Sequence, residues 1–185
     1  MTFPVDLFLI DNITMTDNTA VLSNDTRSLQ YNARQLVGQR FEVSMTCRAL
    51  PKNKKAAIGY LSSLRGGLTV ETISVPEYFE SDSGSKVVST SLAIGVSSVP
   101  LQSATDVSIG DYCQFSGHTK IYCVTGISGD TLTIHPNLVR PVASQEVLNF
   151  NGIEMTVRST NKTQSYDSPS RHHPIDIDIN FVEVL

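Results

Sequence analysis

The sequence contains no tryptophan, only three cysteines, and charged residues at 17% of its composition. No apolar run approaches the length of a membrane span, so we expect no insertion into a membrane. The opening stretch, MTFPVDLFLIDN, has neither a basic region nor a cleavage site, which predicts that no secretion signal is present. Three cysteines cannot all pair within one chain and no CxxC motif occurs, so we expect reduced thiols and synthesis in a cytosol.

The remaining composition is that of a soluble globular protein. Hydrophobic residues make up 40% of the chain, and the mean hydropathy is near zero. A chain of 185 residues can bury one core, or one core with a small companion domain. The formal net charge of −4 argues against specific binding of nucleic acid, which requires a basic surface.

One helix is predicted in a chain that otherwise has the pattern of strands and turns. Pro51 suits the first helical position, because its missing N–H needs no partner there. The helix is expected to end at Arg65, since Gly66 and Gly67 can supply a left-handed C-cap. The predicted helix, at about 51–65, has one apolar stripe that should be buried, formed by Ala57, Tyr60, Leu61 and Leu64.

The start of this helix carries three cations, Lys52, Lys54 and Lys55, where the helix macrodipole disfavours positive charge. Two interpretations stay open. The turn can be an ordinary solvated basic surface, or it can face an acidic partner.

Alternating strands flank the helix. Before it, the stretch RFEVSMTCR places four apolar side chains on one face, namely Phe41, Val43, Met45 and Cys47. The closing stretch, IDIDINFVEVL, places Asp176 and Asp178 on a polar face opposite Ile175, Ile177, Ile179 and Phe181. The alternation changes phase at Val182, which predicts a β-bulge near Phe181–Val182.

A serine-rich stretch from Glu80 to Ser91 is predicted to be a linker. Beyond it, apolar runs at 112–115, 120–125 and 131–134 are separated by turn sequences, Gly117–His118 and Gly129–Asp130, and predict a three-strand meander. Both faces of this meander carry bulky side chains, which favours a small closed or half-closed barrel.

The predicted fold class is therefore mainly β. We expect a β-sandwich domain with one helix from residues 1–90, an inserted small OB-like β-barrel from 91–150, and closing strands of the sandwich from 151–185. The strand that resumes the first sheet is predicted at 153–160.

No catalytic constellation is recognisable. His118, His135 and the pair His172–His173 fall in turns and loops, and the pair lacks a third metal ligand at motif spacing near Asp176 or Asp178. The carboxylates are expected on strand exteriors, and Cys113 and Cys123 are expected to pack. No GxSxG, HExxH or phosphate-binding loop occurs. We expect no enzyme, no metal site and no cofactor.

Three stretches together resemble the distal tail proteins of long-tailed bacteriophages and their prophage relatives. The first is GQRFEVSMTCRALPKNKKAAIGYLSSLRGG, a strand followed by a proline-started helix. The second is SIGDYCQFSGHTKIYCVTGISGDTLTIHPNLVRPV, which resembles a GD strand, short hairpin and closing segment of such tail proteins. The closing INFVEVL is similar as well, whereas DNITMTDNTAVLSNDTRSLQ shows no motif of the family.

The resemblance implies a structural virion protein. In that family the strand–helix–strand unit is a β-sandwich belt domain whose copies close into a hexameric ring around the tail lumen. The ring joins the tail tube protein to the tail-tip hub protein that carries receptor-binding parts, while the second domain projects outward. The implied location is the tail tip of the virion, after synthesis in the host cytoplasm.

Two further expectations concern surfaces. In a ring, the turn with Lys52, Lys54 and Lys55 would meet acidic groups of the neighbouring copy, for which Asp176 and Asp178 are candidates. The alternative function is a carbohydrate-binding or other accessory interaction module that uses the small barrel, with Tyr112 and Tyr122 as ligand-facing aromatics. Core packing explains these aromatics about as well, and the absence of tryptophan counts against a sugar site.

Overall fold

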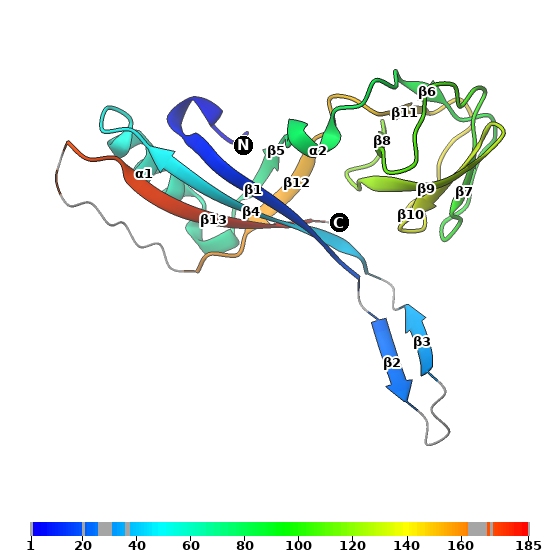
Figure 1. The fold of residues 1–185 in the computed structure, drawn as a ribbon, viewed down its shortest axis with the longest axis horizontal. Helices are drawn as coiled ribbons and strands as arrows, with labels where there is room; N and C mark the ends of the chain where they lie inside the picture. The colour runs from blue at the N-terminus through cyan, green and yellow to red at the C-terminus, as the bar shows by residue number, and fades with distance from the viewer. Residues whose placement is uncertain are drawn as a thin grey trace. The chain divides into compact units, whose positions relative to one another are not determined.

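The computed structural model of the chain describes residues 2–19, 21–25, 31–35, 38–162, 170 and 172–184. It is built from antiparallel sheets with few helical segments (Figure 1), which confirms the predicted mainly β fold class and is consistent with a β-sandwich. The chain divides into two compact units: unit 1 comprises Met1–Glu71 and Val157–Val184, and unit 2 comprises Thr72–Thr156. Unit 2 thus begins before, and ends after, the barrel expected at 91–150.

Unit 1 contains a five-stranded antiparallel sheet in the order β1-β4-β13-β12-β5. The strands are β1 (Leu9–Asn18), β4 (Arg40–Ala49), β5 (Val70–Ile73), β12 (Met155–Ser159) and β13 (Ile175–Glu183). The boundary with unit 2 runs through β5 and β12. A short 3-10 helix, η1 (Val5–Leu7), precedes β1.

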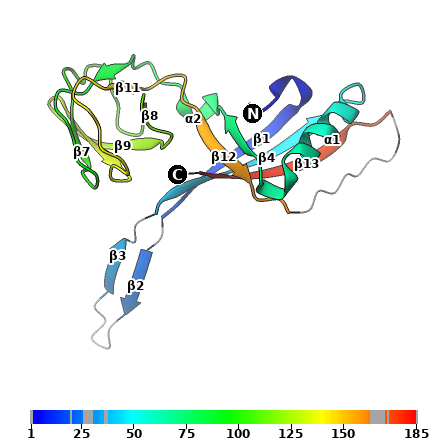
Figure 2. The same cartoon turned by 180° about the vertical axis from the view of Figure 1, so that it is seen from behind.

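The inner face of this sheet is apolar, as the alternation predicts. The side chains Phe41, Val43, Met45 and Cys47 of β4 are all buried, as are Ile175, Ile177, Ile179 and Phe181 of β13. Helix α1 (Lys54–Ser63) covers this side of the sheet, as Figures 1 and 2 show from front and back. Its predicted stripe of Ala57, Tyr60, Leu61 and Leu64 is buried, as expected.

The bounds of the helix differ from the prediction. Pro51 lies in the turn before α1, and the helix begins at Lys54 with Asn53 at the N-cap position. The Asn53 amide does not cap the helix; it donates to the carbonyl oxygens of Asp6 and Leu7 at 3.1 and 3.4 Å and so ties the turn to η1. Pro51 therefore starts the turn, and the helix begins at Lys54, directly after Asn53.

Helix α1 ends at Ser63, before the predicted Arg65, and its C-cap residue is Leu64 in a right-handed conformation, so the predicted glycine C-cap does not form. A 3-10 segment, η2 (Arg65–Gly67), follows α1, and both glycines have positive φ, 61° at Gly66 and 94° at Gly67. Arg65 therefore lies in η2, beyond the last turn of α1. A left-handed backbone is open to glycine without a steric cost, so the pair reverses the chain toward β5.

The prediction of a β-bulge in the closing strand is wrong. The pairing of β13 with β4 runs without a register shift from Ile175 opposite Ala49 to Val182 opposite Glu42. The inward position after Phe181 is taken by Glu183, which is buried and accepts a hydrogen bond from the Phe41 N–H at 3.0 Å. The strand keeps its phase because a hydrogen-bonded carboxylate, not a valine, occupies the last core position.

A second, two-stranded sheet belongs to unit 1. Strand β2 (Val21–Asp25) pairs with β3 (Tyr31–Gln35), and among the described strands neither pairs with any other. In the sequence this hairpin follows the end of β1 and precedes the start of β4.

Unit 2 is a small antiparallel sheet of six strands in the order β6-β11-β8-β9-β10-β7. The strands are β6 (Lys86–Val87), β7 (Ser98–Pro100), β8 (Tyr112–Phe115), β9 (Tyr122–Ser128), β10 (Thr131–His135) and β11 (Val147–Asn149), preceded by helix α2 (Pro76–Phe79). A bridge between Val88 and Leu101 joins the two edge strands, because Ser89 N–H donates to Pro100 and Gln102 N–H donates to Val87. The sheet is thereby closed into a barrel.

The barrel encloses its own apolar core, which includes Val88, Val99, Phe115, Tyr122, Leu132, Leu148 and Phe150. The three strands of the meander form, β8 with the predicted bounds and β9 and β10 with shifted ones, and the Gly129–Asp130 turn joins β9 to β10. The predicted linker at 80–91 contains β6, because Lys86 and Val87 pair with β11. Its small polar residues are part of the barrel.

Candidate functional site

The outer face of the unit 1 sheet places Asp176 and Asp178 beside partners of the same chain. The Arg48 Nε donates to the Asp176 carboxylate at 2.7 Å, and the same guanidinium lies 3.6 Å from Asp11. The Thr46 hydroxyl donates to Asp178 at 3.0 Å. Both aspartates thus have partners across the β4–β13 pairing, and both remain exposed, with 67% of the Asp176 side chain open to solvent.

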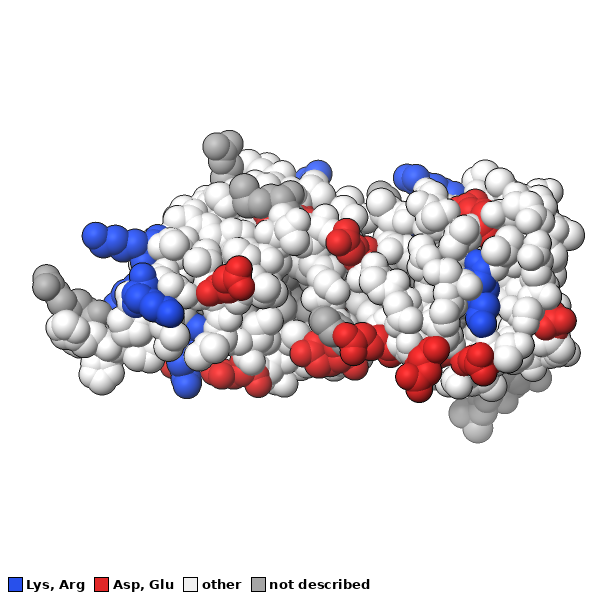
Figure 3. All heavy atoms as spheres, turned by 90° about the horizontal axis from the view of Figure 1, so that it is seen from above, with Lys and Arg blue, Asp and Glu red and all other residues white. Residues whose placement is uncertain are grey.

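The three lysines lie at the start of α1, as expected. Lys52 and Lys55 are exposed and have no hydrogen-bond or ion-pair partner in the part of the chain that the structure describes. The Lys54 ammonium donates to the carbonyl oxygen of Ser170 at 3.3 Å. Figure 3 shows Lys and Arg side chains gathered at the end of unit 1 where α1 lies. We call Lys52, Lys54 and Lys55 the lysine turn.

The two tyrosines proposed as ligand-facing aromatics do not form an exposed surface. Tyr122 is fully buried in the barrel core and packs edge-on against Phe115 with ring centroids 5.5 Å apart, so the expectation fails for this residue. Tyr112 is half-buried and packs edge-on against Phe79, also at 5.5 Å. The pairing of Tyr112 with Cys123 puts Cys113 and Cys123 on opposite faces, as predicted for packing residues.

His118, which the sequence places in a turn, is buried. Its Nδ1 lies 3.2 Å from the Tyr122 hydroxyl and its Nε2 lies 3.3 Å from the Pro141 carbonyl oxygen. The carboxylate of Glu146 accepts from the N–H groups of Gly117 and Ala143 at 3.1 and 3.0 Å. These contacts fasten the β8–β9 turn to the segment before β11, which is a structural role.

A carboxyl group and a phenol share the core of unit 1. Glu71 is 1% exposed, and one of its oxygens accepts a hydrogen bond from the Tyr60 hydroxyl at 3.3 Å. Its other oxygen has no partner among the described residues. Burial first, and the charge of Glu71 second, raise the pKa of the Tyr60 hydroxyl. The expectation that all carboxylates lie on strand exteriors is therefore wrong for Glu71 and Glu183.

Burial favours the protonated form of two of the three thiols, Cys47 and Cys113. Burial first, and the negative charges of Asp11 and Asp178 second, raise the pKa of the Cys47 thiol to about 12. Burial also raises the pKa of Cys113. Because the thiolate is the nucleophile, these cysteines act as packing residues at neutral pH.

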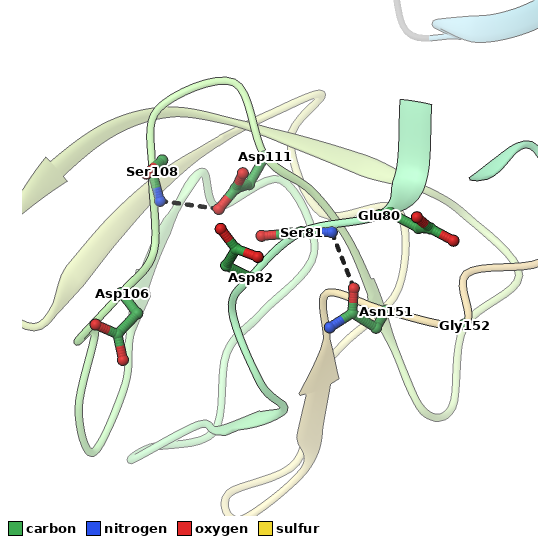
Figure 4. Close-up of a pocket in the computed structure, with 8 residues that line it drawn as sticks. All are labelled: Glu80, Ser81, Asp82, Asp106, Ser108, Asp111, Asn151 and Gly152. Atoms are coloured by element: carbon green, nitrogen blue, oxygen red, sulfur yellow. Dashed lines mark hydrogen bonds between the residues drawn. The ribbon is translucent and has the colours of Figure 1, made fainter. Parts of the chain in front are cut away.

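Unit 2 carries an acidic hollow of about 790 Å³ on its surface (Figure 4). Three segments of unit 2 line it: the stretch after α2, the β7–β8 connection and the β11–β12 connection. The carboxylates in its lining belong to Glu80, Asp82, Asp106 and Asp111. Figure 4 shows Glu80 and Asp106 on opposite sides of the hollow in that view, with Asp82 and Asp111 between them. We call these four residues the acidic hollow.

The frame of the hollow is fixed by hydrogen bonds. Asp111 accepts from the Ser108 N–H at 2.8 Å and from the buried Ser83 hydroxyl at 3.3 Å. Asn151 accepts from the Ser81 N–H at 2.9 Å and donates to the Ser83 carbonyl oxygen at 2.8 Å. Glu80, Asp82 and Asp106 are exposed, and no described cation neutralises them. No aromatic residue lines the hollow, so it offers no ring on which a sugar could stack.

Within the described ranges, no group of three or more His, Cys, Asp or Glu could hold a metal ion. None of the helices in the described residues is long and apolar enough to cross a membrane. No protein-family model matches the chain, and no curated protein matches it either.

Proposed function

We propose that this chain is a structural protein of a long-tailed phage. Copies of it close into a ring, most simply a hexamer, at the distal end of the tail tube, and link the tube to the tail-tip hub and receptor-binding parts. The ring is part of the virion, and no catalysis, cofactor or membrane insertion is involved. The observation that carries this proposal is the edge strand β1 of the unit 1 sheet.

Strand β1 is long for an edge strand. It runs from Leu9 to Asn18, and among the described strands only β4 pairs with it. Edge strands of monomeric proteins are usually short or carry Lys or Pro, because their unpaired N–H and C=O groups would otherwise recruit another chain. β1 contains no Lys, Arg or Pro, and beyond a register shift at Ile10–Asn12 its pairing is regular.

Exposed apolar side chains lie at both edges of this sheet. Leu9 on β1 is 51% exposed, and Leu68, just before β5 at the other edge, is 74% exposed. The two edges differ in length and sequence, so a contact between them would be head-to-tail. Head-to-tail contacts generate a closed ring when the rotation between copies fits.

The β2–β3 hairpin supports the same proposal. A two-stranded hairpin is marginally stable in water unless a third strand or a packed surface supports it. Among the described residues no third strand pairs with β2 or β3. In an assembly, a neighbouring protein can supply that support.

The test introduces charge into the edge strand. Thr14 and Thr16 are exposed on β1, so Thr14→Lys with Thr16→Lys should leave the fold intact while lysines of adjoining copies repel one another. We expect the parent to form rings in electron micrographs and the variant to remain monomeric by light scattering, with an unchanged circular dichroism spectrum.

A matched control carries the same added charge elsewhere. Thr90→Lys with Thr119→Lys alters two exposed threonines of unit 2, and this variant should assemble as the parent does. A parent that stays monomeric, or an edge variant that assembles normally, would contradict the proposal. Labelling of intact particles with an antibody against the chain should decorate the tail tip.

No observation favours the alternative function, a carbohydrate-binding module. Tyr122 lies in the core, and the acidic hollow has no aromatic lining.

A further inference from the structure

Asn151 and Gly152 form the only Asn-Gly pair of the sequence, and both are exposed in the lining of the hollow of unit 2. Glycine has no side chain, so its backbone nitrogen can approach the side-chain amide of the preceding asparagine without a steric clash. A bond between the Gly152 nitrogen and the side-chain carbonyl carbon of Asn151 closes a small, unstrained ring. The pair therefore holds a nucleophile and an electrophile next to each other.

The backbone nitrogen of Gly152 is free to react. Its N–H donates no hydrogen bond within the part of the chain that the structure describes. No atom lies within 4 Å of the position that a Cβ of Gly152 would take, so water can reach the turn. Neither a hydrogen-bond acceptor nor a packed side chain thus competes with the reaction at this nitrogen.

The side-chain amide of Asn151 is held in place and polarised. The Ser81 N–H donates to its Oδ1 at 2.9 Å (Figure 4), and its Nδ2 donates to the Ser83 carbonyl oxygen at 2.8 Å. Attack on the carbonyl carbon places negative charge on Oδ1, where the Ser81 N–H can stabilise it. A donor of this kind is worth about 100-fold or more in enzymes, whereas repulsion by exposed carboxylates such as Glu80 and Asp82 costs at most about fivefold.

We propose that Asn151 is a site of spontaneous deamidation. The Gly152 nitrogen bonds to the Cγ of Asn151 and gives up its proton, the bond from Cγ to Nδ2 breaks, and Nδ2 leaves with a proton as ammonia. Water then adds to either carbonyl carbon of the cyclic imide, and the bond from that carbon to the ring nitrogen breaks. The product is aspartate or isoaspartate. One water is consumed and one ammonia is released, with no oxidation or reduction.

The product changes the charge and the hydrogen bonding of the hollow. It adds a carboxylate to those of Glu80, Asp82, Asp106 and Asp111. An aspartate at position 151 has no N–H to donate to the Ser83 carbonyl oxygen, so two acceptors face each other there. Segment 81–83 thereby loses a tie to the β11–β12 connection, and unit 2 should become less stable. This inference does not depend on the proposed ring.

The first experiment follows the reaction in the full-length chain. The protein is incubated at mildly alkaline pH and sampled by peptide mass mapping, with a synthetic peptide of residues 147–156 as the unfolded reference. We expect Asn151 to lose its amide at least about tenfold faster than Asn53 and Asn161, which lysine follows in the sequence. The rate in the folded protein should rise with salt, because salt screens the nearby carboxylates.

The second experiment tests the consequence with matched variants. Asn151→Asp should lower the midpoint of thermal unfolding more than Asn149→Asp does. Asn149→Asp adds the same charge two positions away, and the Asn149 Oδ1 only accepts, from the Ser85 hydroxyl at 2.9 Å, so aspartate can keep that bond. Equal midpoints would overturn the stated effect on unit 2. An Asn151 amide that persists in the folded protein while the peptide loses it, or equal rates at Asn53 and Asn161, would overturn the proposal.

Discussion

At the residue scale, the burial of Leu61 tests whether α1 and the sheet share one core. Leu61 is 1% exposed, so Leu61→Ala should lower the free energy of unfolding by about 2–5 kcal/mol through lost apolar contact and a residual cavity. Leu68→Ala is the control, because Leu68 is exposed and its truncation should change stability by no more than about 0.5 kcal/mol. Urea unfolding measures both, and equal losses would show that the helix stripe is not the core.

The Cys47 thiol should make the stability of the protein depend on pH. A free thiol in the unfolded chain has a pKa of about 8.5, whereas the folded protein raises the pKa of Cys47 to about 12. The folded state therefore holds this proton more tightly, and the stability it contributes is full below about pH 8.5 and is lost progressively as pH rises toward about 12. The raised pKa values of Cys113 and Tyr60 act in the same direction.

We expect the urea midpoint of the parent to fall between about pH 8 and about pH 11, and Cys47→Ala to make that fall less steep. The comparison uses slopes, because the substitution also removes packing and shifts the whole curve. Parallel curves for the parent and Cys47→Ala would show that the thiol does not contribute to the alkaline loss of stability.

The sequence could not predict where individual polar side chains lie. Glu71, Glu183 and His118 occupy core positions because each finds a hydrogen bond there, with Tyr60, with the Phe41 N–H, and with Tyr122 and Pro141. Periodicity does not show such partners, whether they are near in sequence, as Tyr122 is to His118, or distant, as Phe41 is from Glu183, and it therefore assigns these residues to the surface. The predicted bulge in β13 arose from this limitation, since it treated Glu183 as an outward residue.

At the element scale, two glycines near α1 should respond in opposite ways to alanine. Gly67 has a φ of 94°, and a Cβ there would collide with the backbone carbonyl of Ser159, so Gly67→Ala should cost at least about 1 kcal/mol. Gly59 lies in the middle of α1 with open space around its Cα, so Gly59→Ala should stabilise the protein by about 0.5–1 kcal/mol. Thermal unfolding of the two variants measures the contrast, and changes of the same sign would contradict this account of the helix end.

The elements themselves were largely predictable. Alternation in β4 and the stripe of α1 depend on local pattern, and both form where that pattern places them. The helix start was misplaced because Asn53 makes a contact with η1 that no local rule encodes. The strand β6 was missed since its two residues pair with β11, far along the chain.

At the scale of the whole molecule, unit 2 has a core of its own. The bridge between Val88 and Leu101 closes the barrel, and its buried cluster lies entirely within the unit. A fragment of residues 75–154 should therefore fold alone, with cooperative thermal unfolding followed by circular dichroism. A fragment that is unfolded under native conditions would show that the barrel depends on unit 1.

The central claim is that copies of this chain close into a ring through the edges of unit 1. The mass of the protein in solution tests that claim most directly. Light scattering coupled to size exclusion, with electron micrographs of the same fractions, should show one closed species with the mass of a hexamer of the 20.2 kDa chain. The population of this closed species should rise with protein concentration, and no series of larger oligomers should form. A mass of 20.2 kDa at every concentration, or open filaments in place of rings, would contradict the claim.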